Sequence, residues 1–133
     1  LGVALPPNAG EDSVSFLSDL RGQPEAARAP IVHHSINGAF AIRDGAWKLA
    51  FCPGSGGWSQ PRDAEARQQG LPELQLYDLA RDIGETRNLH RDRPEVVTQL
   101  TARLQHIIAE GRSTPGPRQA NDVPVQFKAP VRP

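Results

Sequence analysis

The chain has 133 residues, of which 38% are hydrophobic and 23% are charged, and this composition is typical of one soluble globular domain. Fifteen basic residues balance fifteen acidic ones, and no apolar run reaches the roughly 18 residues that a membrane span needs, so we expect neither a nucleic-acid partner nor a membrane partner. The single cysteine excludes an internal disulfide. The absence of methionine, even at position 1, predicts a piece of a longer protein.

Residues 1–30 are expected to form a linker with one short amphipathic helix. Residues 13–20 can form one or two helical turns, with Phe16, Leu17 and Leu20 on one side. Gly22 would end this helix, and the polar segment 23–30 would continue as a loop.

The clearest pattern lies in residues 31–52, where three apolar segments are separated by Asn37-Gly38 and Asp44-Gly45. Such dipeptides are strong signals of two-residue hairpin turns, because both central residues of a type I′ turn need a positive φ. The pattern therefore predicts a three-stranded antiparallel meander.

Two-residue turns would also set the register, with His34 opposite Ala41 and Ala41 opposite Lys48. One face of the meander would then be the core face, formed by Ile31, His33, Ser35, Phe40, Ile42, Trp47, Leu49 and Phe51. The other face would be small and basic, formed by Val32, His34, Ile36, Ala39, Ala41, Arg43, Ala46, Lys48 and Ala50.

The rest of the chain predicts a loop, a strand, a helix and a tail. Residues 53–72 are rich in glycine, proline and polar residues and predict a long loop, whereas residues 74–79 alternate like a fourth strand. A helix over 94–110 is indicated by Pro94 at its start, by Gly111 at its end, and by apolar residues at spacings of three and four, namely Val97, Leu100, Leu104, Ile107 and Ile108. Residues 112–133 contain many prolines and predict an extended tail.

Together these elements predict an α+β fold. A four-stranded antiparallel sheet, made of the β-meander 31–52 and the strand 74–79, would pack on one long C-terminal helix over 94–110. The apolar stripe of that helix and the core face of the meander need each other, because neither can be buried alone.

Few residues suggest chemistry. Cys52 closes a strand, and a half-buried structural thiol is the favoured interpretation over a nucleophile. His33 and His34 would point to opposite faces of a strand, so they could not hold one metal ion together. His34, Arg43 and Lys48 could bind an anion or an acidic partner, although a solvated sheet face is the alternative.

We therefore predict no catalytic residue and no metal ligand in this chain. The glycines of residues 54–57 lack the lysine and the helix of a phosphate-binding loop, and turn chemistry explains the carboxylates of residues 78–85. The candidates for substrate binding or docking are His33, His34, Arg43 and Lys48.

Three segments resemble the C-terminal region of sulfatases. Residues 33–49, which end in Ala-Ile-Arg-Asp-Gly-Ala-Trp-Lys-Leu, are similar to a strand typical of that family. Residues 73–89 resemble the family's stretch with Glu-Leu-Tyr-Asp-Leu followed by Asn-Leu, although Ile83 replaces the usual proline. Residues 12–17 resemble the segment that follows the catalytic domain, and the likeness extends over about residues 5–120.

The resemblance implies a parent protein that hydrolyses sulfate esters and has an alkaline-phosphatase-like fold. Its nucleophile would be a formylglycine, made from the first residue of a Cys/Ser-x-Pro-x-Arg motif, beside a calcium ion. Both belong to the larger N-terminal catalytic domain, which would be the partner of this chain and would hold the sulfate ester. Cys52 does not fit the motif, because Pro53 follows it directly and Gly56 stands at the arginine position. A typical bacterial parent would be periplasmic or secreted.

Three interpretations follow. In the first, residues 31–111 are the C-terminal subdomain of a sulfatase. This subdomain would dock on the catalytic domain through its small basic face, and its first strand and the 53–72 loop would rim the substrate pocket. It would not be catalytic alone. In the second, the parent is a sister hydrolase of phosphonate or phosphate esters. In the third, the chain is a separate module whose basic face binds an acidic ligand or protein.

Overall fold

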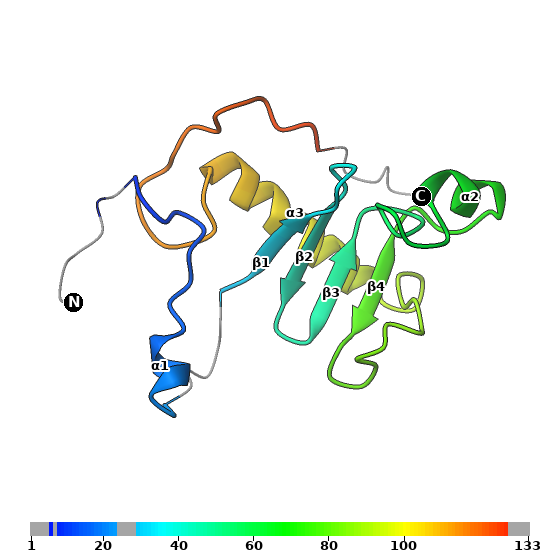
Figure 1. Cartoon of the computed structure of the whole chain (residues 1–133), viewed down its shortest axis with the longest axis horizontal. Coiled ribbons are helices and arrows are strands. Elements are labelled where there is room, and N and C mark those ends of the chain that lie inside the picture. The colour runs from blue at the N-terminus through cyan, green and yellow to red at the C-terminus, as the bar shows by residue number, and fades with distance from the viewer. Residues whose placement is uncertain (1–5, 7, 24–28, 128–133) are drawn as a thin grey trace.

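The computed structural model describes residues 6, 8–23 and 29–127, and these contain three helices and four strands. In chain order the elements are α1 (Leu17–Leu20), β1 (Ile31–His34), β2 (Phe40–Asp44), β3 (Trp47–Ala50), α2 (Asp63–Gln68), β4 (Gln75–Asp78) and α3 (Pro94–Glu110). The strands form one antiparallel sheet in the order β1-β2-β3-β4, and α3 crosses the back of this sheet in the view of Figure 1. The predicted α+β fold is confirmed, and α3 has the predicted bounds.

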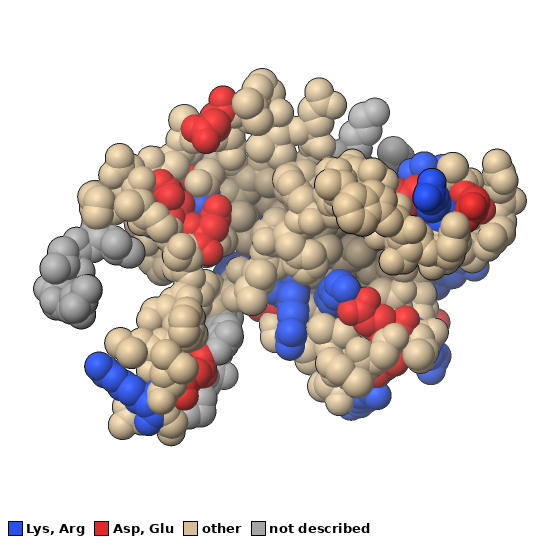
Figure 2. All heavy atoms as spheres, in the orientation of Figure 1, with Lys and Arg blue, Asp and Glu red and all other residues tan. Residues whose placement is uncertain are grey.

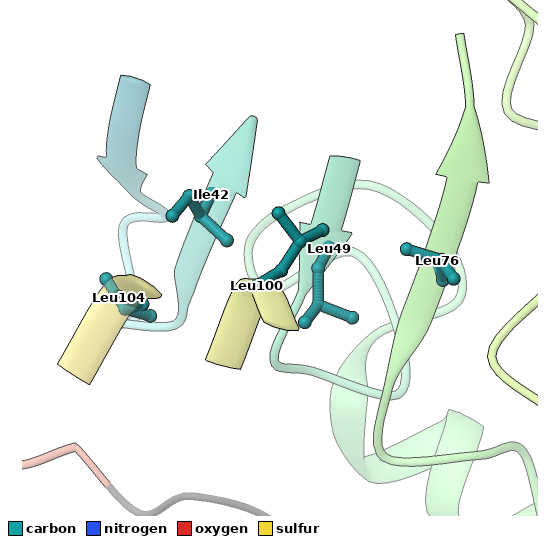
Figure 3. Packing of buried hydrophobic residues seen from close by; sticks show 5 residues of the cluster. All are labelled: Ile42, Leu49, Leu76, Leu100 and Leu104. Carbon is teal, nitrogen blue, oxygen red and sulfur yellow. The ribbon is translucent and has the colours of Figure 1, made fainter. Parts of the chain in front are cut away.

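The core lies between the sheet and α3. Ile42, Leu49 and Leu76, one from each of three neighbouring strands, meet Leu100 and Leu104 of the helix (Figure 3). Phe40 and Trp47 are partly buried and pack against this cluster, as the sequence predicts. Burial of each such side chain contributes roughly 1.5–3 kcal/mol, so this cluster is the main source of stability.

Both ends of α3 follow from its sequence. Pro94 takes the first turn, where its missing N–H needs no partner. Gly111 ends the helix with a φ of 65°, and a side chain there would collide with the carbonyl of Gln119. Because Gly111 turns the chain back, the Gln119 N–H donates to the Glu110 carbonyl at 2.9 Å, and the segment after α3 stays close to the helix.

The outer edge of β4 is closed by Asn88 and Leu89. The Asn88 Oδ1 accepts a hydrogen bond from the Leu76 N–H at 3.0 Å, and its Nδ2 donates to the Leu74 carbonyl at 2.8 Å. The Leu89 N–H donates to the Leu76 carbonyl at 2.8 Å. These groups satisfy a strand edge that would otherwise present unpaired backbone groups.

The predicted register of the first hairpin is wrong by one residue. His34 lies opposite Phe40 and His33 opposite Ala41, because the loop has three residues, Ile36 to Gly38, and not two. The Ser35 N–H donates to the Ala39 carbonyl at 2.9 Å, and Gly38 has a φ of 77°, as in three-residue loops with a glycine in the left-handed region. A one-residue shift exchanges the two faces of β1.

The predicted register of the second hairpin is wrong by two residues, which leaves the faces unchanged. Lys48 lies opposite Arg43 and Asp44 opposite Trp47. The central turn residues are therefore Gly45 and Ala46, and only Gly45 has a positive φ, of 58°. This is the pattern that a type II′ turn requires, with glycine at the first central position.

Three other predictions need correction or comment. The 53–72 segment is not a loop throughout, because its second half contains α2. The apolar side of α1 is exposed, since Phe16, Leu17 and Leu20 show 61%, 49% and 73% of their surface.

The predicted tail contacts the domain: Phe127 packs edge-to-face on Phe51. The linker 1–30 and the tail 112–133 stay predictions, since residues 1–5, 7, 24–28 and 128–133 lie outside the described part.

Replacing Leu104 by alanine is expected to lower the free energy of unfolding by about 2–5 kcal/mol, because this fully buried side chain leaves a cavity between α3 and the sheet. Gln105→Ala, on the exposed side of the same helix, should change it by less than about 0.5 kcal/mol. Urea titrations of both variants test this, and an effect of Leu104→Ala as small as that of the control would show that α3 is peripheral.

Asn88→Ala should destabilise the chain by about 1–3 kcal/mol, because it leaves the Leu76 N–H and the Leu74 carbonyl without their partner at the sheet edge. Asn88→Asp is a second comparison, since it keeps an acceptor for Leu76 but turns a carboxylate oxygen toward the Leu74 carbonyl in place of the donor. Thermal unfolding should therefore rank the wild type above both variants. A variant as stable as the wild type would mean that the side chain does not act through these two bonds.

Candidate functional site

The sheet has a second face, opposite α3, which we call the polar face. The observed registers place on it Ile31, His33, Ala41, Arg43, Lys48, Ala50, Gln75 and Tyr77. Three of the four predicted site residues thus share one face: Arg43 lies directly opposite Lys48, and His33 lies in the neighbouring row, opposite Ala41. Ala41 and Tyr77 are buried, with 7% and 8% of their surface exposed, so this face is less open than the sequence predicts.

His34 is the predicted candidate that the structure removes from this face. Its ring lies 4.1 Å from that of Phe40, edge-to-face, on the side of the sheet that carries α3. There it lines a groove of about 740 Å³ with Val32, Ile108 and Val125. His33 takes the place predicted for His34, as the shifted register of β1 requires.

One of the two cations of the polar face, Lys48, is neutralised by an acidic residue. The Lys48 Nζ donates to both carboxylate oxygens of Glu85, at 2.7 and 2.8 Å, and both side chains are about one-quarter to one-third exposed. Glu85 has a φ of 55°, the single positive φ outside glycine in the described chain. The sequence does not predict a role for Glu85, because the pair is separated by 37 residues and no local pattern connects them.

The same mixture of charges extends over the surface on this side of the sheet. Figure 2 shows basic side chains next to acidic ones rather than a wide patch of one sign. Arg43 remains exposed, and its Nε donates to the Gly45 carbonyl at 3.3 Å. The face therefore has directional hydrogen-bonding groups and little net field.

Titration of the polar face is shaped mainly by burial. The pKa of His33 is lowered, first by desolvation and then by the positive charge of Lys48, with an opposing effect of Glu85. The pKa of Tyr77 is raised by desolvation and by the negative charge of Glu85. Both shifts favour the neutral form of the side chain, so these two residues can act as hydrogen-bonding groups without carrying charge.

Residues 52–62 form a loop that lies beside the tip of the first hairpin, and we call it the glycine loop. The Gln75 Nε2 of β4 donates to the carbonyls of Cys52 and Gly54, at 2.8 and 2.7 Å, and Gln75 Oε1 accepts from the Tyr77 hydroxyl at 2.7 Å. The glycine loop is thus fixed to the polar face by a side chain that belongs to that face.

Cys52 is buried in this arrangement, and burial outweighs the one donor near its sulfur, Gln75 Nε2 at 3.7 Å. Its pKa is raised, first by desolvation and then by the negative charge of Asp63, and its thiol donates to the Gly54 carbonyl at 3.3 Å. A nucleophilic cysteine needs the opposite, a lowered pKa and an accessible sulfur. The geometry supports the structural interpretation of this residue.

The described residues contain no group of three or more His, Cys, Asp or Glu side chains that could hold a metal ion. Within the same residues, no helix is both long and apolar enough to cross a membrane.

Comparisons with known proteins identify what this fold corresponds to. No family model matches the chain. It is 34% identical over 110 residues to N-acetylgalactosamine-6-O-sulfatase of Bacteroides thetaiotaomicron, a match that covers 77% of this chain and 20% of the relative. The chain also matches a solved structure with 31% identity and a TM-score of 0.59. That structure comes from work on the metabolism of multiple glycosaminoglycans by the same organism, and its label ends in "6S-sulf". That match covers 78% of this chain and 21% of the solved one.

The chain corresponds to the C-terminal region of a sulfatase. The predicted resemblance is thereby confirmed both in sequence and in fold. The chain spans about a fifth of the length of the sulfatases it matches. Within the sulfatase-like stretch 73–89, the structure gives two residues a clear role: Asn88 closes the edge of β4, and Glu85 pairs with Lys48.

The lowered pKa of His33 predicts a pH dependence of stability. The unfolded chain takes up a proton near the ordinary histidine pKa of 6.5, before the folded chain does, so this site destabilises the fold as the pH falls through that range. Denaturant titrations between about pH 7.5 and 5.5 should therefore show a smaller loss of stability for His33→Gln than for the wild type. His90, whose pKa is also lowered by burial, provides a second variant, His90→Gln, with the same expected sign. An unchanged pH profile of His33→Gln would contradict the assignment.

Proposed function

We propose that this chain is the C-terminal subdomain of a sulfuric ester hydrolase and that its role is structural rather than catalytic. The observation that carries the proposal is the pair of matches to sulfatases, each of which covers most of this chain and about a fifth of the other protein. The relative named as an N-acetylgalactosamine-6-O-sulfatase favours a sulfated amino sugar as the substrate of the whole protein over a phosphate or phosphonate ester.

The partner of the chain is the catalytic domain of the same protein. By the family resemblance, that domain supplies the formylglycine nucleophile and the calcium ion. The residues of this chain then have a positioning role, and Cys52, with its buried thiol and raised pKa, takes no part in the reaction.

The polar face is the surface that docks on the catalytic domain. The opposite face of the sheet is already covered by α3, whereas the polar face presents the exposed Arg43 and the small, partly exposed side chain of Ala50. A small residue allows another backbone to approach closely, and the charges of Lys48 and Glu85 are already paired with each other within the face. Shape and hydrogen bonding therefore contribute more to docking than charge does.

The glycine loop and His33 lie at the edge of this face and rim the substrate pocket. Gln75 fixes the loop to β4, and the loop contacts the tip of the first hairpin, where a Cβ on Gly56 would lie 3.0 Å from the Ser35 side chain. Docking through the polar face thus brings the loop to the margin of the interface, next to the catalytic domain.

Complementation tests this proposal. The purified 133-residue chain should release no sulfate from N-acetylgalactosamine 6-sulfate, and it should restore activity to the related Bacteroides thetaiotaomicron sulfatase shortened by the segment that this chain matches. Arg43→Glu, on the polar face, should weaken this restoration about 3–10-fold. Arg103→Glu, a charge reversal at another exposed arginine on α3, is the matched control and should leave it unchanged.

Three outcomes would overturn the proposal. Turnover by the chain alone would show that it is catalytic. Equal effects of the two charge reversals would show that the polar face is not the docking face. If the chain does not associate with the shortened relative and the free chain binds an acidic ligand, a separate binding module would be favoured.

A further inference from the structure

Trp58 is the most exposed aromatic side chain in the described part of the protein, with 79% of its surface accessible. Tryptophan is the largest apolar side chain, and on average it is highly buried in folded proteins. Trp47, the other tryptophan, follows that rule and packs against the core. Exposure of Trp58 alone would not indicate a site, so the structure around it decides the question.

The loop that carries Trp58 is held in place on both sides of the ring. The Ser55 N–H donates to the Pro61 carbonyl at 2.9 Å, and the Gly56 N–H donates to the Asp63 Oδ1 at 3.0 Å. The Gly57 N–H donates to the Ser55 Oγ at 3.1 Å. Because these bonds fix the backbone before any ligand arrives, binding at Trp58 would not carry the entropic cost of ordering a flexible loop.

The stretch of chain that carries the ring is polar and uncharged, and charged side chains begin at the exposed Arg62, the N-cap of α2. Residues 51–60 contain no charged side chain, and the exposed neighbours of Trp58 in this stretch are Ser55, Ser59 and Gln60. Hydroxyl and amide groups pair with neutral hydroxyl groups, and an aromatic ring provides a flat apolar surface. This combination suits a sugar, which has an apolar face of C–H groups and an edge of hydroxyls.

We propose that Trp58 stacks on a sugar ring of a sulfated polysaccharide or of an oligosaccharide cut from it, and that Ser55 and Ser59 contact its hydroxyls. The choice of a sulfated amino sugar as the ligand rests on the proposed function. Trp58 is a binding residue in this proposal and takes no part in the hydrolysis. The ring binds the carbohydrate part of the ligand, so the sulfate group itself is not required for stacking.

A protein partner is the competing occupant of this surface, and Ile36 distinguishes the two. Ile36 is 67% exposed at the tip of the first hairpin, and a Cβ on Gly57 would lie 3.2 Å from its Cγ2. An apolar protein surface would cover Ile36 and Trp58 together, since interface anchors cluster. A sugar stacked on Trp58 does not need the isoleucine side chain.

The test uses the full 133-residue chain labelled with ¹⁵N and follows the two tryptophan indole N–H signals, which the Trp58→Phe variant assigns. The probes are N-acetylgalactosamine 6-sulfate, unsulfated N-acetylgalactosamine and inorganic sulfate. We expect both sugars to shift the Trp58 signal in a saturable way and to leave the Trp47 signal in place. Inorganic sulfate should shift neither signal.

Variants then separate stacking from other contacts, with backbone spectra as the readout for binding and folding. Trp58→Ala should weaken sugar binding at least about tenfold. Trp58→Phe should weaken it by about threefold or less, because it keeps a flat ring. Ile36→Ser should leave it unchanged. Thermal unfolding checks that each variant is folded, and Trp58→Ala should be neutral there because the ring is exposed.

The proposal is overturned if neither sugar shifts the Trp58 signal, if inorganic sulfate alone reproduces the shift, or if Ile36→Ser is as damaging as Trp58→Ala. Its failure can be told from failure of the proposed function. If the chain restores the shortened relative but the free chain binds no sugar, the sulfatase role is retained and stacking is rejected. If the free chain binds sugar but does not restore the shortened relative, stacking is retained and the sulfatase role is rejected.

Discussion

The length of one loop determines which side chains of this protein form the core and which form the candidate site. The first hairpin turns through Ile36 to Gly38, and Gly38 supplies the positive φ that this three-residue connection needs. A loop shorter by one residue would place His33 toward α3 and His34 on the polar face. The surface that we propose for docking is therefore a consequence of backbone geometry at the tip of the hairpin.

Much of the fold could be predicted from the sequence, because its strongest signals are local. The 3.6-residue period, Pro94 and Gly111 identify α3 with its observed bounds, and alternation identifies β4 within one residue at each end. The turn dipeptides indicate both hairpins but not their registers. Asn-Gly also occurs in a three-residue loop, and the glycine of Asp-Gly can be the first central residue of the turn instead of the second. The sequence does not predict α2, because its glycine- and proline-rich surroundings outweigh the helix-favouring residues from Asp63 to Gln68.

The candidate site was harder to predict, because its main interactions join segments that are distant in the sequence. The sequence places Arg43 and Lys48 on the correct face, but the partner of Lys48 is 37 residues away, on a turn. The anchoring of the glycine loop by Gln75 bridges 21 residues or more. Periodicity does not indicate such contacts, so the sequence predicts a basic face where the structure pairs one of the two cations, Lys48, with Glu85.

The polar face and the rigid glycine loop suit two different kinds of contact. The polar face has the Lys48 charge already paired with Glu85 and offers hydrogen-bonding groups, which suits a protein interface made by shape and hydrogen bonds. The glycine loop keeps its aromatic ring in water and satisfies its own backbone with internal bonds, so it needs no protein partner to hold its shape. Because Gln75 and Tyr77 join the two, a substrate-facing loop can keep a fixed position relative to the docked face.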